Sequence, residues 1–139
     1  MKLIRKSKKA GFSLVELTIV ILVLGVLTTF AVPRYMRTVE KSKAAEAFSY
    51  LAEIASSQAR YNAQHGEYAS SLIDLDIELR APNHFAVGSP TSGDFETEWE
   101  VALNRTGPAS GYSPYTVVFD ENGFDSVSST IPAELVTFN

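Results

Sequence analysis

One apolar run constrains this chain more than any other feature. Residues 12–32 read FSLVELTIVILVLGVLTTFAV and contain a single ionisable side chain, Glu16. At about 1.5 Å of rise per residue, a helix of this length extends about 31 Å, which matches the hydrocarbon thickness of a bilayer. The sequence therefore predicts one membrane-spanning helix to which the rest of the chain is attached.

Charge is distributed unevenly around this run. The formal net charge is −4. Five bases and no acid precede the run: Lys2, Arg5, Lys6, Lys8 and Lys9. From residue 44 onward the chain has 14 acids and three bases. The leading bases favour a cytoplasmic N-terminus, and the acidic remainder argues against nucleic acid as a partner, because phosphate contacts need Lys and Arg.

Three interpretations of the N-terminal segment compete. A secretory signal would be cut after Ala31, although the apolar run exceeds the usual length of such signals. A plain membrane anchor leaves Glu16 unexplained, because a carboxylate at mid-bilayer costs roughly 2.5–3.5 kcal/mol. Glu16 either forms a capping box with Ser13, which is a purely structural explanation, or it has a function in the membrane.

The residues around Glu16 carry a family resemblance. The stretch KAGFSLVEL, residues 9–17, resembles the processing site of type IV pilins and type II secretion pseudopilins, and the similarity extends from about Lys8 to Tyr61. The resemblance implies that a prepilin peptidase cuts between Gly11 and Phe12 and methylates the new N-terminus. Residues 1–11 would then be a cleaved basic leader, and the helix would be kept.

The same resemblance implies a role for Glu16 in assembly. Its carboxylate would pair with the Phe12 amine of a neighbouring subunit, since pairing offsets part of the desolvation of both charges. A pair within one subunit is the competing geometry, and the sequence does not distinguish the two. Gly25 and Pro33 weaken the helix, and in related pilins the segment between them can lose helicity in the filament. A mild kink in a continuous helix is the alternative.

Helical character continues over residues 34–64. Apolar residues recur at helical spacing: Tyr35, Met36, Val39, Ala44, Phe48, Leu51, Ile54, Ala55 and Ala59. The opposite face is expected to hold Glu40, Lys43, Glu46, Glu53 and Arg60. This pattern predicts one helix of about fifty residues that ends near His65, with Gly66 at the C′ position, and whose second half packs on a sheet.

Residues 65–139 are expected to form a globular head with a small antiparallel sheet. Residues 95–103 alternate with period two and predict a strand. Residues 115–119 and 124–127 flank Asn122-Gly123 and predict a hairpin. A fourth strand is expected around residues 84–87, and a short helical turn near residues 70–75. Residues 88–93 and 107–114 are expected to be loops. The predicted fold class is α+β, pilin-like, with one long helix on a small sheet.

The head offers few candidates for chemistry. Glu96, Glu98 and Glu100 could bind a cation, but alternation alone explains them as a solvated sheet face. Asp120, Asn122 and Asp125 resemble a calcium loop only superficially. Related major pseudopilins hold calcium near their C-terminus, yet no ligand set maps onto this chain. We expect no cofactor otherwise.

Three further features are not expected to be catalytic. Asn104-Arg105-Thr106 is a formal glycosylation sequon. His65 and His84 are expected to lie on the surface. The sequence contains no recognisable nucleophile elbow, phosphate loop or zinc motif, so we expect no enzymatic activity.

The sequence therefore predicts a structural subunit of a type IV pilus-like filament, either a pilin or a major pseudopilin. Residues 12–33 would form the transmembrane and filament-core segment. Expected partners are copies of the chain, related minor subunits, prepilin peptidase, an inner-membrane assembly platform and the lipid bilayer. The head would lie in the periplasm before assembly into a periplasmic or extracellular filament. The alternative is a membrane-tethered periplasmic binding domain that does not polymerise.

Overall fold

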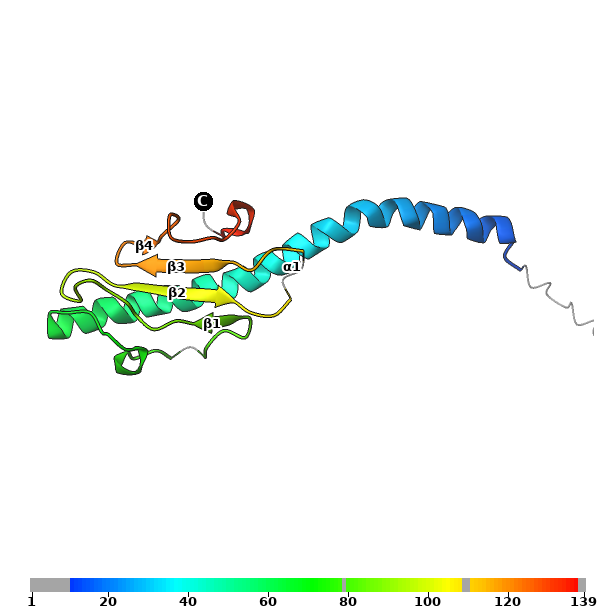
Figure 1. Cartoon of the computed structure of the whole chain (residues 1–139). Coiled ribbons are helices and arrows are strands. Elements are labelled where there is room, and N and C mark those ends of the chain that lie inside the picture. The colour runs from blue at the N-terminus through cyan, green and yellow to red at the C-terminus, as the bar shows by residue number, and fades with distance from the viewer. Residues whose placement is uncertain (1–10, 79, 109–110, 138–139) are drawn as a thin grey trace, which may run out of the picture. The chain divides into compact units, whose positions relative to one another are not determined.

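The computed structural model describes residues 11–78, 80–108 and 111–137. The predicted leader, apart from Gly11, lies outside these residues. The chain divides into two compact units, Met1–Tyr35 and Met36–Asn139, and each is described by itself. One helix, α1 (Leu14–His65), contributes to both units (Figure 1). The predicted long helix and small antiparallel sheet are confirmed.

In the first unit, α1 is continuous and its apolar side chains are exposed. It passes through Gly25 and Pro33 without a break. The hydroxyls of Thr28 and Thr29 both donate to the Gly25 carbonyl, each at 3.0 Å. The helix is long and apolar enough to cross a membrane by length and composition.

In the second unit, α1 ends at His65 as predicted. Gly66 has a φ of 82°, and its N–H donates to the Asn62 carbonyl at 2.8 Å. Glycine adopts this left-handed conformation without a Cβ penalty, which makes it a common residue after a helix.

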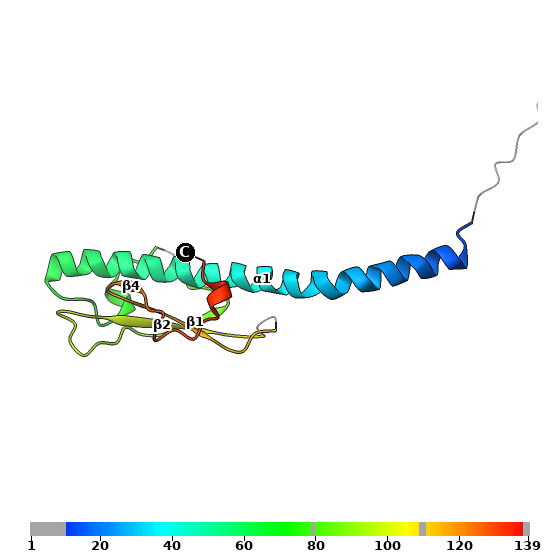
Figure 2. The same cartoon turned by 90° about the horizontal axis from the view of Figure 1, so that it is seen from above.

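In the described residues, four strands form one antiparallel sheet in the order β1-β2-β3-β4. They are β1 (Phe85–Val87), β2 (Glu100–Arg105), β3 (Thr116–Asp120) and β4 (Gly123–Phe124). The sheet lies along the C-terminal half of α1 (Figure 2). The expected fourth strand is confirmed as β1. The expected turn is confirmed as the short helix η1 (Leu72–Asp74), which the Ser71 hydroxyl caps; a second short helix, η2 (Ala133–Leu135), lies near the C-terminus.

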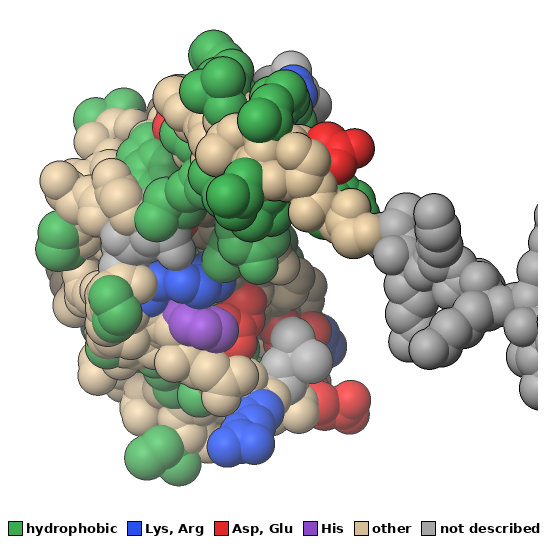
Figure 3. Space-filling view, turned by 90° about the vertical axis from the view of Figure 1, so that its right-hand side faces the viewer, with side chains coloured by type: hydrophobic (Ala, Val, Ile, Leu, Met, Phe, Trp, Pro, Cys, Tyr) green, Lys and Arg blue, Asp and Glu red, His purple; other side chains and the backbone are tan. Residues whose placement is uncertain are grey.

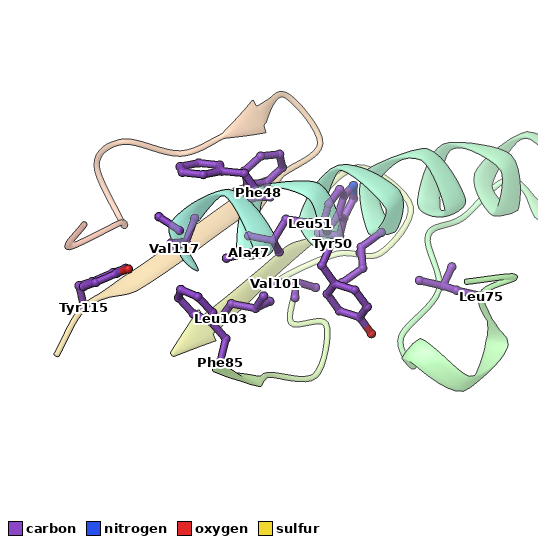
Figure 4. Packing of buried hydrophobic residues seen from close by; sticks show 14 of the residues in the cluster. Ala47, Phe48, Tyr50, Leu51, Leu75, Phe85, Val101, Leu103, Tyr115 and Val117 are labelled. Atoms are coloured by element: carbon purple, nitrogen blue, oxygen red, sulfur yellow. The ribbon is translucent and has the colours of Figure 1, made fainter. Parts of the chain in front are cut away.

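The core lies between α1 and the inner face of the sheet (Figure 4). Phe48 packs against Phe119 and Phe124, with ring centroids 6.1 and 5.3 Å apart. Leu51, Ile54, Val101, Leu103 and Val117 are fully buried. Burial of such apolar side chains is the main force that holds the sheet on the helix.

The apolar face predicted from Tyr35 to Ala59 on α1 is wrong at both ends, because residues there are not buried as expected. Tyr35 and Met36 are exposed, and so is Ala59, whereas Ser57 and Gln58 are fully buried. The described helix packs on the sheet only from about residue 39 onward. Near the C-terminal end of α1, Gln58 is buried because its side chain hydrogen-bonds to the backbone of Ala69 in the loop that follows the helix.

The strand predicted over residues 95–103 is only partly correct. Residues 95–97 form a turn, in which Asp94 accepts the Glu96 N–H at 3.0 Å through its carboxylate. Asp94 also accepts the Glu98 N–H at 3.0 Å through its carbonyl. An aspartate that bonds the backbone two residues on favours a turn over a strand. Glu96 and Glu98 therefore do not form a sheet face with Glu100, which corrects that interpretation.

The hairpin around residues 120–123 is confirmed, but its second strand is shorter than predicted. Asp120 pairs with Gly123, and the positive φ of 110° falls on Gly123. After Phe124 the chain turns, because the Asp125 carboxylate accepts the Val127 N–H at 2.7 Å. Beyond this turn, the hydroxyls of Ser129 and Thr130 accept N–H groups from the outer edge of β3.

Candidate processing and assembly site

The predicted processing and assembly residues lie together at the start of α1. Gly11 and Phe12 precede the helix, and Phe12 is 85% exposed. The Ser13 N–H donates to Glu16 Oε2 at 2.9 Å, and the Val15 N–H donates to Ser13 Oγ at 3.3 Å. This is the capping-box arrangement, in which two side chains satisfy N–H groups of the first turn.

The capping box keeps the Glu16 carboxylate close to the chain segment that would be cut. Its oxygen reaches the backbone nitrogen of Ser13, one residue after Phe12. The first turn of a helix also favours negative charge electrostatically. The Glu16 carboxylate therefore lies at the helix terminus, bonded to a backbone N–H.

The apolar surface behind this site is extensive. The following large hydrophobic residues between Leu14 and Leu27 are each 47–82% exposed: Leu14, Val15, Leu17, Ile19, Val20, Ile21, Leu22, Val23, Leu24, Val26 and Leu27. Soluble monomers rarely expose so large a contiguous apolar patch. This segment therefore needs lipid or other protein surfaces around it.

Gly25 lies within this apolar segment, and Pro33 lies six residues after Leu27 in the same helix. Pro33 has no N–H to give to the carbonyl of residue 29, which weakens the helix at that turn. The threonine hydroxyls on the Gly25 carbonyl compete with the helical bond at the same acceptor. The described helix is nevertheless continuous here, so loss of helicity on assembly stays a prediction.

Sequence reasoning missed a buried ionic cluster in the second unit. Glu40, expected on the solvent face, is 0% exposed. Its Oε1 accepts hydrogen bonds from Arg105 Nε at 2.6 Å and from the Tyr115 hydroxyl at 3.0 Å. Its Oε2 accepts from Arg105 Nη2 at 3.3 Å and lies 3.5 Å from Lys43 Nζ. We call Glu40, Arg105 and Tyr115 the buried cluster.

The buried cluster shifts the pKa of each member. Burial alone would raise the pKa of Glu40, but hydrogen bonds from Arg105 and Tyr115 outweigh it and lower the pKa. The hydrogen bond to Glu40 raises the pKa of Arg105. Burial and the nearby Glu40 charge raise the pKa of Tyr115. The cluster is therefore ionised as a carboxylate–guanidinium pair at neutral pH.

One sequence signal could have located part of this cluster. Val101 and Leu103 point inward, so the same period of two places Arg105 inward if the strand continues to that residue. The predicted strand ends at Leu103, two residues before Arg105. The partner on α1 is 65 positions away, and no local pattern identifies it.

Two other polar contacts hold loops on α1. The buried Gln58 side chain donates to the Ala69 carbonyl at 2.9 Å and accepts the Ala69 N–H at 2.8 Å. Glu46 accepts the Asn83 N–H at 2.8 Å and lies 2.8 Å from His84 Nδ1. Charged side chains of both signs adjoin a histidine on the face in Figure 3. The contacts of Gln58 with Ala69 and of Glu46 with Asn83 hold the segment between α1 and β1 on the helix.

The remaining candidates show no metal centre. No group of three or more His, Cys, Asp or Glu side chains in the described part of the chain could hold a metal ion. Asp120 and Asp125 use carboxylate oxygens to accept backbone N–H groups. In the sequon, Asn104 Oδ1 accepts the Thr116 hydroxyl at 2.8 Å. His65 is exposed and its ring stacks on Tyr61.

Comparisons with known proteins agree with the features at the N-terminus. The family described as the prokaryotic N-terminal methylation motif matches residues 6–32. The type IV major fimbrial protein FimA of Dichelobacter nodosus is 30% identical over 106 residues, which are 76% of this chain and 64% of that protein. The chain thus spans slightly less than two thirds of that relative's length.

Two further relatives come from different systems. The type II secretion system core protein G of Aeromonas hydrophila is 28% identical over 78 residues, covering 56% of this chain and 54% of that protein. The type IV major pilin protein PilA of Myxococcus xanthus is 26% identical over 105 residues, covering 75% and 47%. No solved structure matches the chain significantly. The motif, the fold and these relatives together show that the chain is similar to type IV pilins and type II secretion pseudopilins.

Proposed function

We propose that the chain is a structural subunit of a type IV pilus-like filament, a pilin or a major pseudopilin, and that it has no enzymatic role. One observation carries the proposal. A continuous, exposed apolar helix begins within residues 6–32, which match the N-terminal methylation motif. Such a surface must be covered by lipid before assembly and by other helices after it.

Processing supplies the first step of the proposed mechanism. A prepilin peptidase hydrolyses the Gly11–Phe12 peptide bond with water and releases the basic leader. It then transfers a methyl group from a methyl-donor cosubstrate to the new Phe12 amine, which gives up a proton. The helix stays in the inner membrane with the acidic head in the periplasm, an orientation that the leading bases favour.

Charge pairing supplies the second step. The methylated Phe12 amine of one subunit and the Glu16 carboxylate of its neighbour are each costly in hydrocarbon. Their pairing offsets part of that cost and fixes the stagger between adjacent helices. The inner-membrane assembly platform would then add further copies and related minor subunits.

A Glu16→Ala variant tests this function. We expect it to remain in the membrane with a folded head but to yield no sheared or purified filaments, because the incoming helix lacks its charged partner. Glu67→Ala removes an exposed acid from the second unit and serves as the control, which should assemble normally. Normal filaments from Glu16→Ala would contradict the pairing. Absence of filaments from both the native chain and the Glu67→Ala control would favour a tethered binding domain.

A further inference from the structure

We propose that the buried Glu40–Arg105 pair sets the register of the sheet along α1, meaning the turn of the helix on which the sheet docks. The inference concerns the second unit alone and does not depend on filament assembly. It starts from the contrast between two kinds of contact at the same interface: repetitive apolar contacts and one fully buried ion pair.

The apolar contacts define the register poorly. Ala44, Ala47, Phe48, Leu51 and Ile54 all face the sheet, and they follow each other at intervals of three or four residues. Sliding the sheet by four residues, about one turn or 5.4 Å, would bring an apolar residue to four of these five positions in the C-terminal direction and to three in the N-terminal direction. Because the hydrophobic effect is non-directional, such displaced packings keep much of its driving force.

The ionic pair tolerates no such displacement. If the sheet were displaced one turn toward the C-terminus of α1, Arg105 would face Lys43 and Ala44. If it were displaced one turn toward the N-terminus of α1, Arg105 would face Met36 and Arg37. In both cases a buried guanidinium would lose its carboxylate and meet an apolar or cationic neighbour. A buried charge without a partner is strongly destabilising, so both displaced arrangements are disfavoured.

Arg105 is held in place from several segments at once. Its Nη1 donates to the carbonyls of His84, at 3.1 Å, and Thr106, and its Nη2 donates to the Pro108 carbonyl at 3.4 Å. The guanidinium also lies 5.7 Å from the centre of the Phe85 ring. The cation is thus fixed relative to β1 and β2, and Glu40 alone supplies its carboxylate from α1.

Another polar contact across the interface is less selective. Glu46 bonds to residues 83 and 84, but it is 30% exposed, and His84 is 44% exposed. A pair this accessible exchanges readily with water and contributes little. Gln58 is also buried, but it bonds to Ala69 in the loop after α1 and not to a strand. The buried pair, with the Glu40 side chain at 0% and the Arg105 side chain at 1% exposure, is therefore the contact between α1 and the sheet itself that discriminates best between registers.

Cysteine cross-linking of the full chain in detergent tests the proposal. The sequence has no cysteine, so Asn83→Cys can be combined with Glu46→Cys, Ser42→Cys or Ser49→Cys and treated with a short bismaleimide. Glu46 contacts Asn83 in the native register, whereas residues 42 and 49 lie about one turn away on either side. In the native background we expect cross-links from position 46 only.

The decisive variant replaces the pair by apolar residues, Glu40→Met with Arg105→Met. We expect it to fold, because apolar residues of similar volume can replace a buried ion pair, and to raise cross-linking from position 42 or 49 at least tenfold. Tyr115→Phe, which leaves the pair intact, should keep the native pattern and is the matched control.

Three results would overturn the proposal. A folded double variant that cross-links only from position 46 would show that apolar packing alone sets the register. An unfolded double variant, judged by circular dichroism, would show that the pair supplies stability rather than register. Equal off-register cross-linking in Tyr115→Phe would show that the effect does not belong to the ion pair.

Discussion

At the scale of single residues, two fully buried polar side chains on α1 fix how the rest of the second unit meets the helix. Glu40 binds Arg105 and Tyr115, and Gln58 binds both backbone groups of Ala69. Each is placed where an apolar residue would satisfy the hydrophobic pattern. Glu40 and Gln58 instead make hydrogen bonds that an apolar side chain could not make.

The lowered pKa of Glu40 makes the stability of the second unit depend on pH. A carboxyl group with a pKa lower in the folded than in the unfolded state stabilises the fold above its unfolded value, and this contribution is lost as the pH falls through the folded pKa. We expect the melting temperature to drop on acidification below about pH 4.5 more steeply in the native chain than in Glu40→Met with Arg105→Met. Parallel pH profiles, measured by circular dichroism in detergent, would contradict this.

Gln58 gives a second prediction at this scale. In Gln58→Ala the N–H and carbonyl of buried Ala69 lose their partners, at roughly 1–3 kcal/mol for each unsatisfied group. Urea unfolding followed by Trp99 fluorescence should therefore show a free energy of unfolding lower by about 2–6 kcal/mol. Gln64→Ala, at an exposed position of the same helix, should change it little. Equal stability of the two variants would show that water replaces the Gln58 contacts.

At the scale of elements, the first part of α1 combines high apolar content with weakened backbone bonding. The weak positions are Gly25, where nothing lies within 4 Å of an added Cβ, and Pro33 inside the helix. Alanine is favoured over glycine by about 1 kcal/mol and over proline by about 3 kcal/mol in a helix interior. The segment between them should open more easily than its neighbours.

Hydrogen–deuterium exchange in detergent tests this expectation. Amides of residues 26–32 should exchange faster than those of residues 16–23 in the native chain, and Gly25→Ala with Pro33→Ala should slow them at least tenfold. Leu24→Ala is the control, since it removes an apolar side chain without adding or removing a helix breaker. Uniform exchange along the native helix would exclude a built-in weak segment.

Elements were predictable from sequence where the local pattern was long or the turn chemistry explicit. The helix could be followed to His65 because no glycine or proline lies between Pro33 and Gly66. The hairpin could be placed from Asn122-Gly123. The strand predicted from residue 95 failed because Asp94 organises a turn that overrides the alternation. The partner of Glu40 could not be found, since a contact between distant segments leaves no local periodicity.

The candidate site was likewise predictable where its residues lie close together in the sequence. Gly11, Phe12 and Glu16 form one short local motif, and the structure brings them together at the start of α1. The capping bonds of Ser13 with Glu16 were predictable from their spacing alone. The burial of Glu40 depends on the whole sheet and could be seen only in three dimensions.

At the scale of the whole molecule, the two units meet opposite requirements. The apolar side chains of the first are exposed and call for lipid or neighbouring helices, whereas those of the second are buried in a core of its own. A subunit that is stored in a membrane and then assembled into a filament needs both properties in one chain. The proposed processing between Gly11 and Phe12 is the step that would connect the two states.

The intact mass and N-terminal residue of the protein purified from its own membranes test the central claim most directly. We expect a chain that begins at Phe12, with a mass one methyl group greater than that of the unmodified cleaved chain. A chain that still begins at Met1, or one cut after Ala31, would contradict prepilin processing. The apolar helix would then be only an anchor or a signal.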